Sequence, residues 1–285
     1  MLNLIKKTML RALTWLKVLG SFRPVDLKSA INILVSSIID VALYPLYNQN
    51  MINVLGGMYF LKELGLYFYV RPRTEDLYYI IPGREGKIEH FILRAVPEGG
   101  YFVDVGANIG YYTCLIGKVK NNAKVISVEP LPDTFRVLKL NCHLNHIKAI
   151  TINKALWSKA TKLSFCIPKV KGILFYGLSR AGSKDINTCL SSIEIAATTL
   201  DSVLEIYPFP RVDLIKIDAE GSEYEMLLGA KRTIRKTRYL YIECRKGLEA
   251  LIKNYLKKYG FVFARWEVPH AVHLFCVNVQ VTNLK

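Results

Sequence analysis

Short, nearly continuous apolar runs recur along the last two thirds of the chain, and runs of this length are typical of buried parallel strands. We expect such strands at residues 101–105, 124–128, 150–156, 212–217 and 238–242. Segments with helical spacing of apolar residues flank them, at residues 87–96, 111–118, 133–145, 224–235 and 247–259. This alternation predicts an α/β fold with a Rossmann-like, doubly wound, mostly parallel sheet. Apolar runs at 261–266 and 271–277 predict an antiparallel edge hairpin, which brings the sheet to seven strands.

Residues 157–199 interrupt this alternation. Three strand-like segments, at residues 163–167, 173–176 and 193–198, predict an insertion made mainly of hairpins. The polar stretch 179–192 is expected to form a loop within it. We therefore predict that residues 76–285 form one domain that carries this insertion.

Residues 1–75 have a different pattern and predict an N-terminal helical appendage. In residues 1–24, most apolar residues fall on one half of a helical wheel and the bases on the other, which suits either a membrane interface or packing on the chain's own domain. Residues 30–47 are more apolar, but Asp40 within them disfavours a membrane span and favours a buried or interfacial helix. Further helix and turn are expected at 49–66, and a short strand at 78–81.

The net charge of +16 points to an anionic partner, such as nucleic acid, a membrane surface or a phosphorylated substrate. Most of the excess lies in two segments. Residues 1–24 carry five bases and no acid, and residues 231–265 carry eleven bases against two acids. Most bases of the second segment lie near the carboxyl ends of two predicted helices, and these ends point away from the predicted ligand cleft. Cations at the carboxyl end of a helix complement the helix dipole.

The composition excludes several other classes of protein. With 51% apolar residues the chain can form a core, so it is not a disordered protein. The six cysteines are spread out without a Cys-x-x-Cys pair, which disfavours a disulfide scaffold and a zinc ribbon and favours a reducing compartment.

A ligand-binding turn is predicted after the first strand of the sheet. Glycines at 106 and 110 let the backbone approach a ligand, and the following helix presents free N–H groups. Glu129 ends the second strand, where an acid can accept both hydroxyls of a ribose. Two simpler interpretations stay open, since Asp104 can stabilise a turn and Glu129 can be an acid at a helix N-terminus.

Sequence blocks at the strand ends resemble those of a known family. The order Val103-Asp104-Val105-Gly106-Ala107-Asn108-Ile109-Gly110, then Val128-Glu129-Pro130, then Asn153-Lys154-Ala155-Leu156 is similar to class I S-adenosylmethionine-dependent methyltransferases. The block Leu214-Ile215-Lys216-Ile217-Asp218-Ala219-Glu220-Gly221-Ser222-Glu223 is more specific and resembles the FkbM family of O-methyltransferases. Family members often have a histidine where this chain has Arg245.

The resemblance implies S-adenosyl-L-methionine as the cofactor and a set of residues that hold it. Asp104 and Gly106 would meet its methionine end, and Asn108 and Gly110 would line the turn over it. Glu129 would hold the ribose, and the backbone at Ala155 and Leu156 would flank the adenine.

Methyl transfer to a hydroxyl is helped by a base that takes the hydroxyl proton. The candidates follow the fourth and fifth strands, with Asp218 first, then Glu220, and also Glu223 and Glu243. Other roles stay open, because Asp218 can bind the cofactor amine, and Glu220 or Glu223 can cap the next helix. We expect no metal.

We expect an O-methyltransferase that acts on a hydroxyl of a sugar, glycolipid or secondary metabolite. The alternatives are an RNA methyltransferase, which the missing Asp/Asn-Pro-Pro-aromatic block disfavours, and a membrane-associated protein that keeps a non-catalytic cofactor fold. The expected location is cytoplasmic, with residues 1–24 in peripheral contact with the inner face of the membrane. The acceptor and the oligomeric state stay open at this point.

Overall fold

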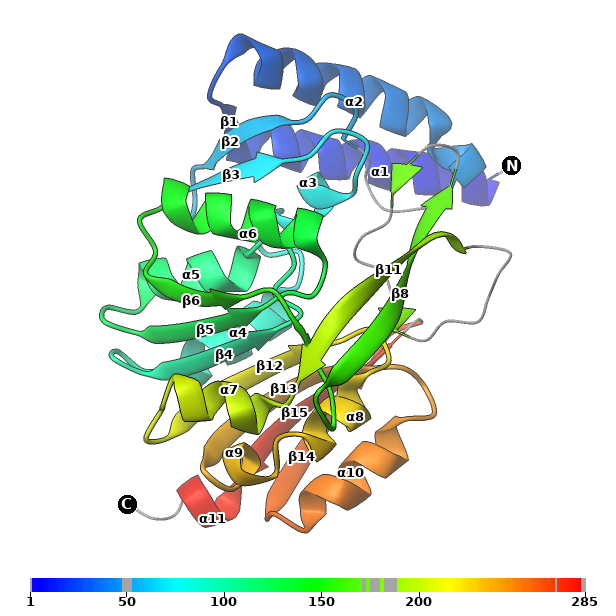
Figure 1. The fold of residues 1–285 in the computed structure, drawn as a ribbon. Helices are drawn as coiled ribbons and strands as arrows, with labels where there is room; N and C mark the ends of the chain where they lie inside the picture. Colours follow the sequence, from blue (N-terminus) through cyan, green and yellow to red (C-terminus); the bar gives the residue numbers. More distant parts are fainter. Residues whose placement is uncertain are drawn as a thin grey trace.

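The computed structural model describes residues 2–47, 53–170, 173–174, 180–181, 189–269 and 271–282. Its centre is a seven-stranded sheet with the order β14-β15-β13-β12-β4-β5-β6 (Figure 1). The strands are β4 (Tyr101–Val105), β5 (Lys124–Val128), β6 (Ala149–Ile152), β12 (Val212–Asp218), β13 (Thr237–Cys244), β14 (Phe261–Glu267) and β15 (Val272–Asn278). All pairs from β13 to β6 are parallel, and β15 runs antiparallel between β13 and β14. The predicted fold class is confirmed.

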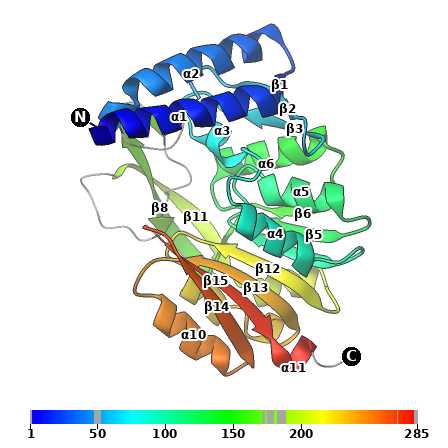
Figure 2. The same ribbon diagram turned by 180° about the vertical axis from the view of Figure 1, so that it is seen from behind.

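Helices cover both faces of this sheet (Figures 1 and 2). One face carries α4 (Gly86–Ala95), α5 (Tyr111–Val119) and α6 (Pro132–Leu144). The other carries α7 (Leu200–Ile206), α8 (Glu223–Leu228), α9 (Lys231–Arg235) and α10 (Glu249–Lys257). The short helix α11 (Val279–Thr282) follows β15. Because the central strands are covered on both sides, they are apolar along nearly their whole length.

The N-terminal segment contains two helices and a small antiparallel sheet. The helices are α1 (Leu2–Ser21) and α2 (Leu27–Tyr47), and the strands are β1 (Phe22–Pro24), β2 (Gly57–Leu61) and β3 (Leu66–Val70). The helix expected within 49–66 was therefore wrong, whereas a turn is present at 62–65, and residues 49–52 lie outside the described residues. Burial alternates with period two along 57–61 and 66–70, and Gly65, at a φ of +62°, turns the chain between them.

This segment shares one hydrophobic core with the main sheet. Trp15, Phe22 and Tyr59 belong to the same buried cluster as Phe102 of β4 and Tyr241 of β13. Asn141 of α6 and Asn145, the residue after it, also bind β3, since their side chains accept the backbone N–H groups of Tyr69 and Tyr67. The segment that follows β3 is thereby held over the carboxyl ends of the main strands.

The strand predicted at 78–81 was also wrong, because the structure has a helical turn there, α3 (Asp76–Tyr79). Local hydrogen bonds favour the turn. The Thr74 hydroxyl accepts the backbone N–H of Asp76, and the Asp76 carboxylate accepts both the backbone N–H and the guanidinium of Arg71. These bonds stabilise the start of a helix rather than an extended chain.

The insertion is dominated by the long antiparallel pair β8 (Thr161–Val170) and β11 (Cys189–Thr198). The short strands β9 (Ile173–Leu174) and β10 (Arg180–Ala181) pair with β8. The third strand predicted at 150–156 is divided in two, since β6 ends at Ile152 and β7 (Ala155–Leu156) pairs with β11 instead. Residues 175–176, 179 and 182–188 of the predicted strand and loop lie outside the described residues, and residues 180–181 and 189–192 of the predicted loop are strand.

The helix predicted at 224–235 is two helices, α8 and α9. Gly229 ends α8, and only glycine fits there, because a Cβ would lie 2.0 Å from the carbonyl oxygen of Trp157. Helix α7 was not predicted. It is capped by Thr199, whose hydroxyl accepts the backbone N–H of Ser202.

One cysteine differs from what the expected reducing compartment would favour. Cys166 of β8 is disulfide-bonded, whereas Cys114, Cys142, Cys244 and Cys276 are free and buried. Among the described residues, no helix is both long and apolar enough to span a membrane.

Candidate active site

A cavity of about 270 Å³ lies at the carboxyl ends of β4, β5 and β12. Of the residues predicted for the cofactor and for catalysis, it brings together Gly106, Asn108, Glu129, Ala155, Leu156, Asp218, Glu220 and Glu243. Asp104, Gly110 and Glu223 do not line it. The strand order explains the clustering, since carboxyl ends of parallel strands meet at one edge of the sheet.

The turn after β4 packs so tightly that its first glycine has no substitute. Gly106 has a φ of +69°, and a Cβ there would lie 1.9 Å from the carbonyl oxygen of Asp218. Asn108 has a φ of +50°, and its buried Oδ1 accepts no hydrogen bond within the described residues. An unpaired buried acceptor beside a cavity fits a ligand that donates to it.

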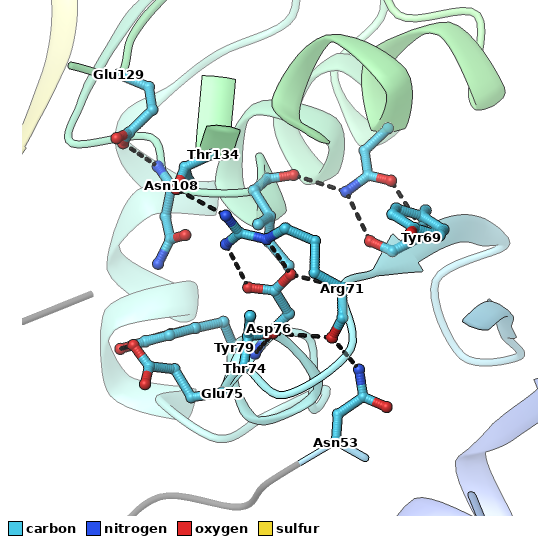
Figure 3. Close-up of polar contacts among 12 residues, drawn as sticks. Asn53, Tyr69, Arg71, Thr74, Glu75, Asp76, Tyr79, Asn108, Glu129 and Thr134 are labelled. Carbon is cyan, nitrogen blue, oxygen red and sulfur yellow. Dashed lines mark hydrogen bonds and ion pairs between the residues drawn. The ribbon is translucent and has the colours of Figure 1, made fainter. Parts of the chain in front are cut away.

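Glu129 is held at the end of β5 by two backbone groups, one on each carboxylate oxygen. Oε2 accepts the N–H of Asn108 at 2.9 Å (Figure 3). Oε1 accepts the N–H of Leu131 at 3.0 Å. Each oxygen keeps a further lone pair for a ligand hydroxyl. Burial raises the pKa of Glu129 to about 7, although these two hydrogen bonds and the nearby Arg71 oppose the rise.

Arg71 joins the N-terminal segment to this part of the site. Its guanidinium donates to Asp76 at 2.7 Å and to Thr134 of α6 at 3.1 Å (Figure 3). Thr134 itself lines the cavity. The segment predicted as an appendage therefore contributes to the architecture around Glu129.

Asp104 lies beneath the cavity and is fully buried. Its carboxylate accepts the hydroxyl of Thr113 at 2.8 Å and forms an ion pair with Lys216 at 3.2 Å. Lys216 does line the cavity, so a ligand meets the ammonium group rather than the Asp104 carboxylate. Gly110 begins α5 with a φ of +91° and packs on Leu138.

Lys216 was not among the predicted site residues. Its ammonium lies between Asp104 and Asp218, at 3.2 Å and 3.8 Å, and donates to the carbonyl oxygen of Gly106 at 3.2 Å. These two acids raise its pKa against the effect of burial, so it stays charged. The signal was available in the sequence, because a lysine in the middle of a buried strand requires an acidic partner.

Asp218 and Glu243 are neighbours in the parallel register of β12 and β13. Burial raises the pKa of Asp218, and the ammonium of Lys216 opposes this rise. The pKa of Glu243 is raised to about 9, first by burial and then by the charges of Asp218 and Glu85. The two carboxyl groups thus differ in their surroundings, since Asp218 has a cation within 4 Å and Glu243 is 3.7 Å from a histidine.

That histidine is His273, which pairs with Glu243 across β13 and β15. Its Nδ1 is 2.8 Å from the hydroxyl of Tyr241, and this hydroxyl is 3.4 Å from Oε2 of Glu243. Burial lowers the pKa of His273, so its ring is neutral at neutral pH. A neutral ring can accept from Tyr241, which leaves the tyrosine oxygen to accept from a protonated Glu243. His270, the other histidine near this hairpin, lies outside the described residues.

The remaining acids differ in position. Glu220 lines the cavity, and its carbonyl oxygen accepts from Arg245 at 3.2 Å. Glu223 instead accepts the backbone N–H of Gly221 at 2.7 Å, which supports its role in the turn before α8. Over the described ranges, no three His, Cys, Asp or Glu side chains are grouped as a metal site would require.

The wall opposite the strand ends comes from α3 and the segment after it. Tyr78, Tyr79, Arg84 and Glu85 line the cavity there. Arg84 pairs with Glu85 at 2.6 Å and lies 4.7 Å from the ring centroid of Tyr78, while the hydroxyl of Tyr112 donates to Glu85 at 2.7 Å. This wall was not predicted, because nothing in its sequence indicates which side of the sheet it crosses.

A parallel sheet with β15 antiparallel beside β13, a glycine turn after β4 and an acid at the end of β5 define the class I S-adenosylmethionine-dependent methyltransferases. A family model for the methyltransferase FkbM domain matches residues 104–263. The chain belongs to the FkbM methyltransferase family.

Curated relatives agree with this assignment. The chain is 26% identical over 165 residues to the hexuronic acid methyltransferase AglP of Haloferax volcanii, covering 58% of this chain and 64% of that protein. It is 27% identical over 159 residues to the methyltransferase sdnD of Sordaria araneosa, covering 47% and 61%. The matches thus span less than two thirds of the length of these relatives. Among solved structures, the N-terminal domain of human METTL16 has a TM-score of 0.46 at 12% identity, covering 95% of this chain and 92% of that one.

Proposed function

We propose that this chain is an O-methyltransferase that uses S-adenosyl-L-methionine to methylate a hydroxyl of a sugar, either free or carried on a lipid or metabolite. The observation that carries the proposal is the pair Asp218 and Glu243, side by side at the strand ends next to the cofactor turn. When bound, the cofactor supplies an electrophilic methyl group on its sulfonium.

The residues around the glycine turn fit this cofactor. Glu129 keeps a free lone pair on each oxygen for the ribose hydroxyls, and the Oδ1 of Asn108 is free to accept from a ligand. Gly106 lets the turn pack directly against the backbone of Asp218 at the edge of the cavity. Ala155 and Leu156 provide an apolar surface for the adenine. Asp104 would act indirectly, by holding Lys216 in place.

Asp218 is the proposed general base. The nearby ammonium of Lys216 favours its ionised form, so it can take the proton of the acceptor hydroxyl. A base in this position contributes about 10²–10⁴-fold to the rate. Glu243, with a pKa of about 9, holds a proton at neutral pH and can donate a hydrogen bond to the acceptor. The two carboxyl groups have different surroundings, with a cation beside Asp218 and a histidine beside Glu243, and such differences are typical of divided roles.

A sugar fits the remainder of the cavity. Tyr78, Tyr79 and Trp157 supply aromatic surface, and the carboxyl groups can bind hydroxyls. The similarity to a hexuronic acid methyltransferase supports a sugar acceptor over other hydroxyl compounds. Five acids line the cavity, namely Glu85, Glu129, Asp218, Glu220 and Glu243, and they disfavour the phosphates of RNA.

The test is transfer of a labelled methyl group from S-adenosylmethionine to separate glycan, lipid and RNA extracts. We expect label in the glycan fraction or in the glycan part of a lipid. We expect Asp218→Asn to lower the rate of transfer by about 10²–10⁴-fold and keep cofactor binding. Label only in RNA, or no label in any fraction with a protein that binds the cofactor, would refute the proposal.

A further inference from the structure

Helix α2 is built with its polar side inward. Ser29, Asn32, Ser36 and Asp40 follow one another at intervals of three and four residues, so they lie along one face, and all four are buried. Each has a partner inside the protein. Asn32 donates to Tyr59 at 2.6 Å and accepts the N–H of Leu55 at 2.7 Å. This arrangement satisfies the polar groups without water.

The opposite face of α2 is apolar and exposed. Leu27, Leu34 and Ile38 expose 76%, 55% and 69% of their surface. In a water-soluble helix the apolar stripe faces the core and the polar face meets water, and α2 has the reverse arrangement. A helix with this pattern is suited to an apolar environment on its outer side.

Helix α1 lies beside α2 and also exposes large apolar side chains (Figures 1 and 2). It packs through Trp15 and Val18, and Trp15 donates to Asp40 at 2.7 Å. Its exposed apolar residues include Met9 and Leu16, at 60% and 64%. The apolar half of the predicted helical wheel is therefore mostly outside, and packing on the domain uses only a narrow side of the helix. We call the exposed residues Met9, Leu13, Leu16, Leu27, Leu34 and Ile38 the outer apolar surface.

The charges around this surface favour anionic lipid over a second copy of the chain as its binding partner. Lys6, Lys7, Arg23 and Lys28 are exposed on the same two helices and the strand between them, and one acid, Asp26, is exposed beside them. Asp40 is buried in an ion pair with Arg11 at 2.6 Å, so it does not offset these charges at the surface. A second copy of the chain would bring the same cations together, whereas anionic lipid headgroups attract them. No helix in the described part can span a bilayer, so the contact is interfacial.

We propose that the outer apolar surface of α1 and α2 docks on a membrane that contains anionic lipid, with the exposed lysines at headgroup level. Lys17 of α1 bonds the segment that forms one wall of the cavity. Its ammonium donates to the carbonyl oxygen of Pro82, which lies in the chain between the wall residues Tyr79 and Arg84. The proposal does not depend on the identity of the methyl acceptor.

The test is flotation of the full chain with vesicles of phosphatidylcholine, with and without phosphatidylserine. Three substitutions together, Leu27→Gln, Leu34→Gln and Ile38→Gln, are expected to lower partitioning by at least about tenfold. The matched control is Ile206→Gln with Leu251→Gln and Val262→Gln, which are exposed apolar residues on other elements, and it should partition like the wild type. The changed side chains are already in contact with solvent, and circular dichroism checks that both variants are folded.

A second pair of variants tests the charges. Lys6→Ala with Lys7→Ala should lower partitioning to phosphatidylserine vesicles by roughly 25-fold, about fivefold for each base, and leave binding to pure phosphatidylcholine unchanged. Absence of wild-type binding to anionic vesicles would overturn the proposal, as would equal binding by the triple α2 variant and its control. Dimerisation in solution that the triple variant abolishes, without any vesicle binding, would assign the surface to a second copy.

Discussion

Substitution of Glu129 by Gln tests the cofactor site at its most constrained residue. In the wild type each carboxylate oxygen accepts one backbone N–H, from Asn108 or Leu131, and keeps a lone pair for a ribose hydroxyl. A glutamine retains one acceptor oxygen and turns an NH₂ group toward one of these N–H donors. Hydrogen bonds to a charged group contribute about 1.5–3 kcal/mol each, so we expect a loss of about 3 kcal/mol, which is roughly a hundredfold weaker binding of S-adenosylmethionine.

The pH dependence sharpens this prediction. The pKa of Glu129 is raised to about 7, so the carboxyl group gains a proton as the pH falls through 7 and then accepts fewer hydrogen bonds. Wild-type affinity should therefore rise with pH between about 6 and 8, and the affinity of Glu129→Gln should be flat over this range.

The assay is calorimetric titration of S-adenosylmethionine into each protein across this pH range. Glu205→Gln is the matched control, because Glu205 is exposed on α7 and pairs with Arg232. Wild-type affinity in Glu129→Gln, with an unchanged pH dependence, would show that this residue does not hold the ribose.

Three other substitutions test the rest of the site. In the wild type, the methylation rate should fall as the pH rises through about 9, because Glu243 then loses its proton. Glu243→Gln should keep its activity at neutral pH and should not show this fall, and a profile of rate against pH measures both. Lys216→Met leaves the carboxylates of Asp104 and Asp218 without their cation, so it should lower the free energy of unfolding by about 3–5 kcal/mol. Denaturant unfolding measures this change, and an unchanged stability would contradict the two ion pairs. Gly106→Ala should abolish cofactor binding in the same titration, because its Cβ would collide with the carbonyl group of Asp218, while Gly86→Ala, with open space around it, should bind normally.

The parallel strands could be predicted from the sequence because burial on both faces requires continuous apolar runs. The runs at 101–105 and 124–128 match β4 and β5 without any shift. The placement of Gly106, Glu129, Asp218 and Glu243 around one cavity then follows from strand order, since all of them lie at or just past carboxyl ends.

Other features depend on contacts between distant segments. β7 leaves the main sheet because it pairs with β11, which is more than thirty residues away in the chain. The wall that contains Tyr78 and Glu85 is placed by Arg71, which contacts α6. The inverted polarity of α2 also escaped prediction, because its buried polar residues find partners such as Asn53 and Tyr59 only in the folded chain.

The position of the transferred methyl group is the most direct test of the proposed function. Mass spectrometry of the product made from methyl-labelled S-adenosylmethionine can locate the label on a single atom. The account predicts a methyl ether on a sugar oxygen with the wild type, and formation of the same product about 10²–10⁴-fold more slowly with Asp218→Asn. A methyl group found on a nitrogen, a carbon or an RNA ribose would contradict it.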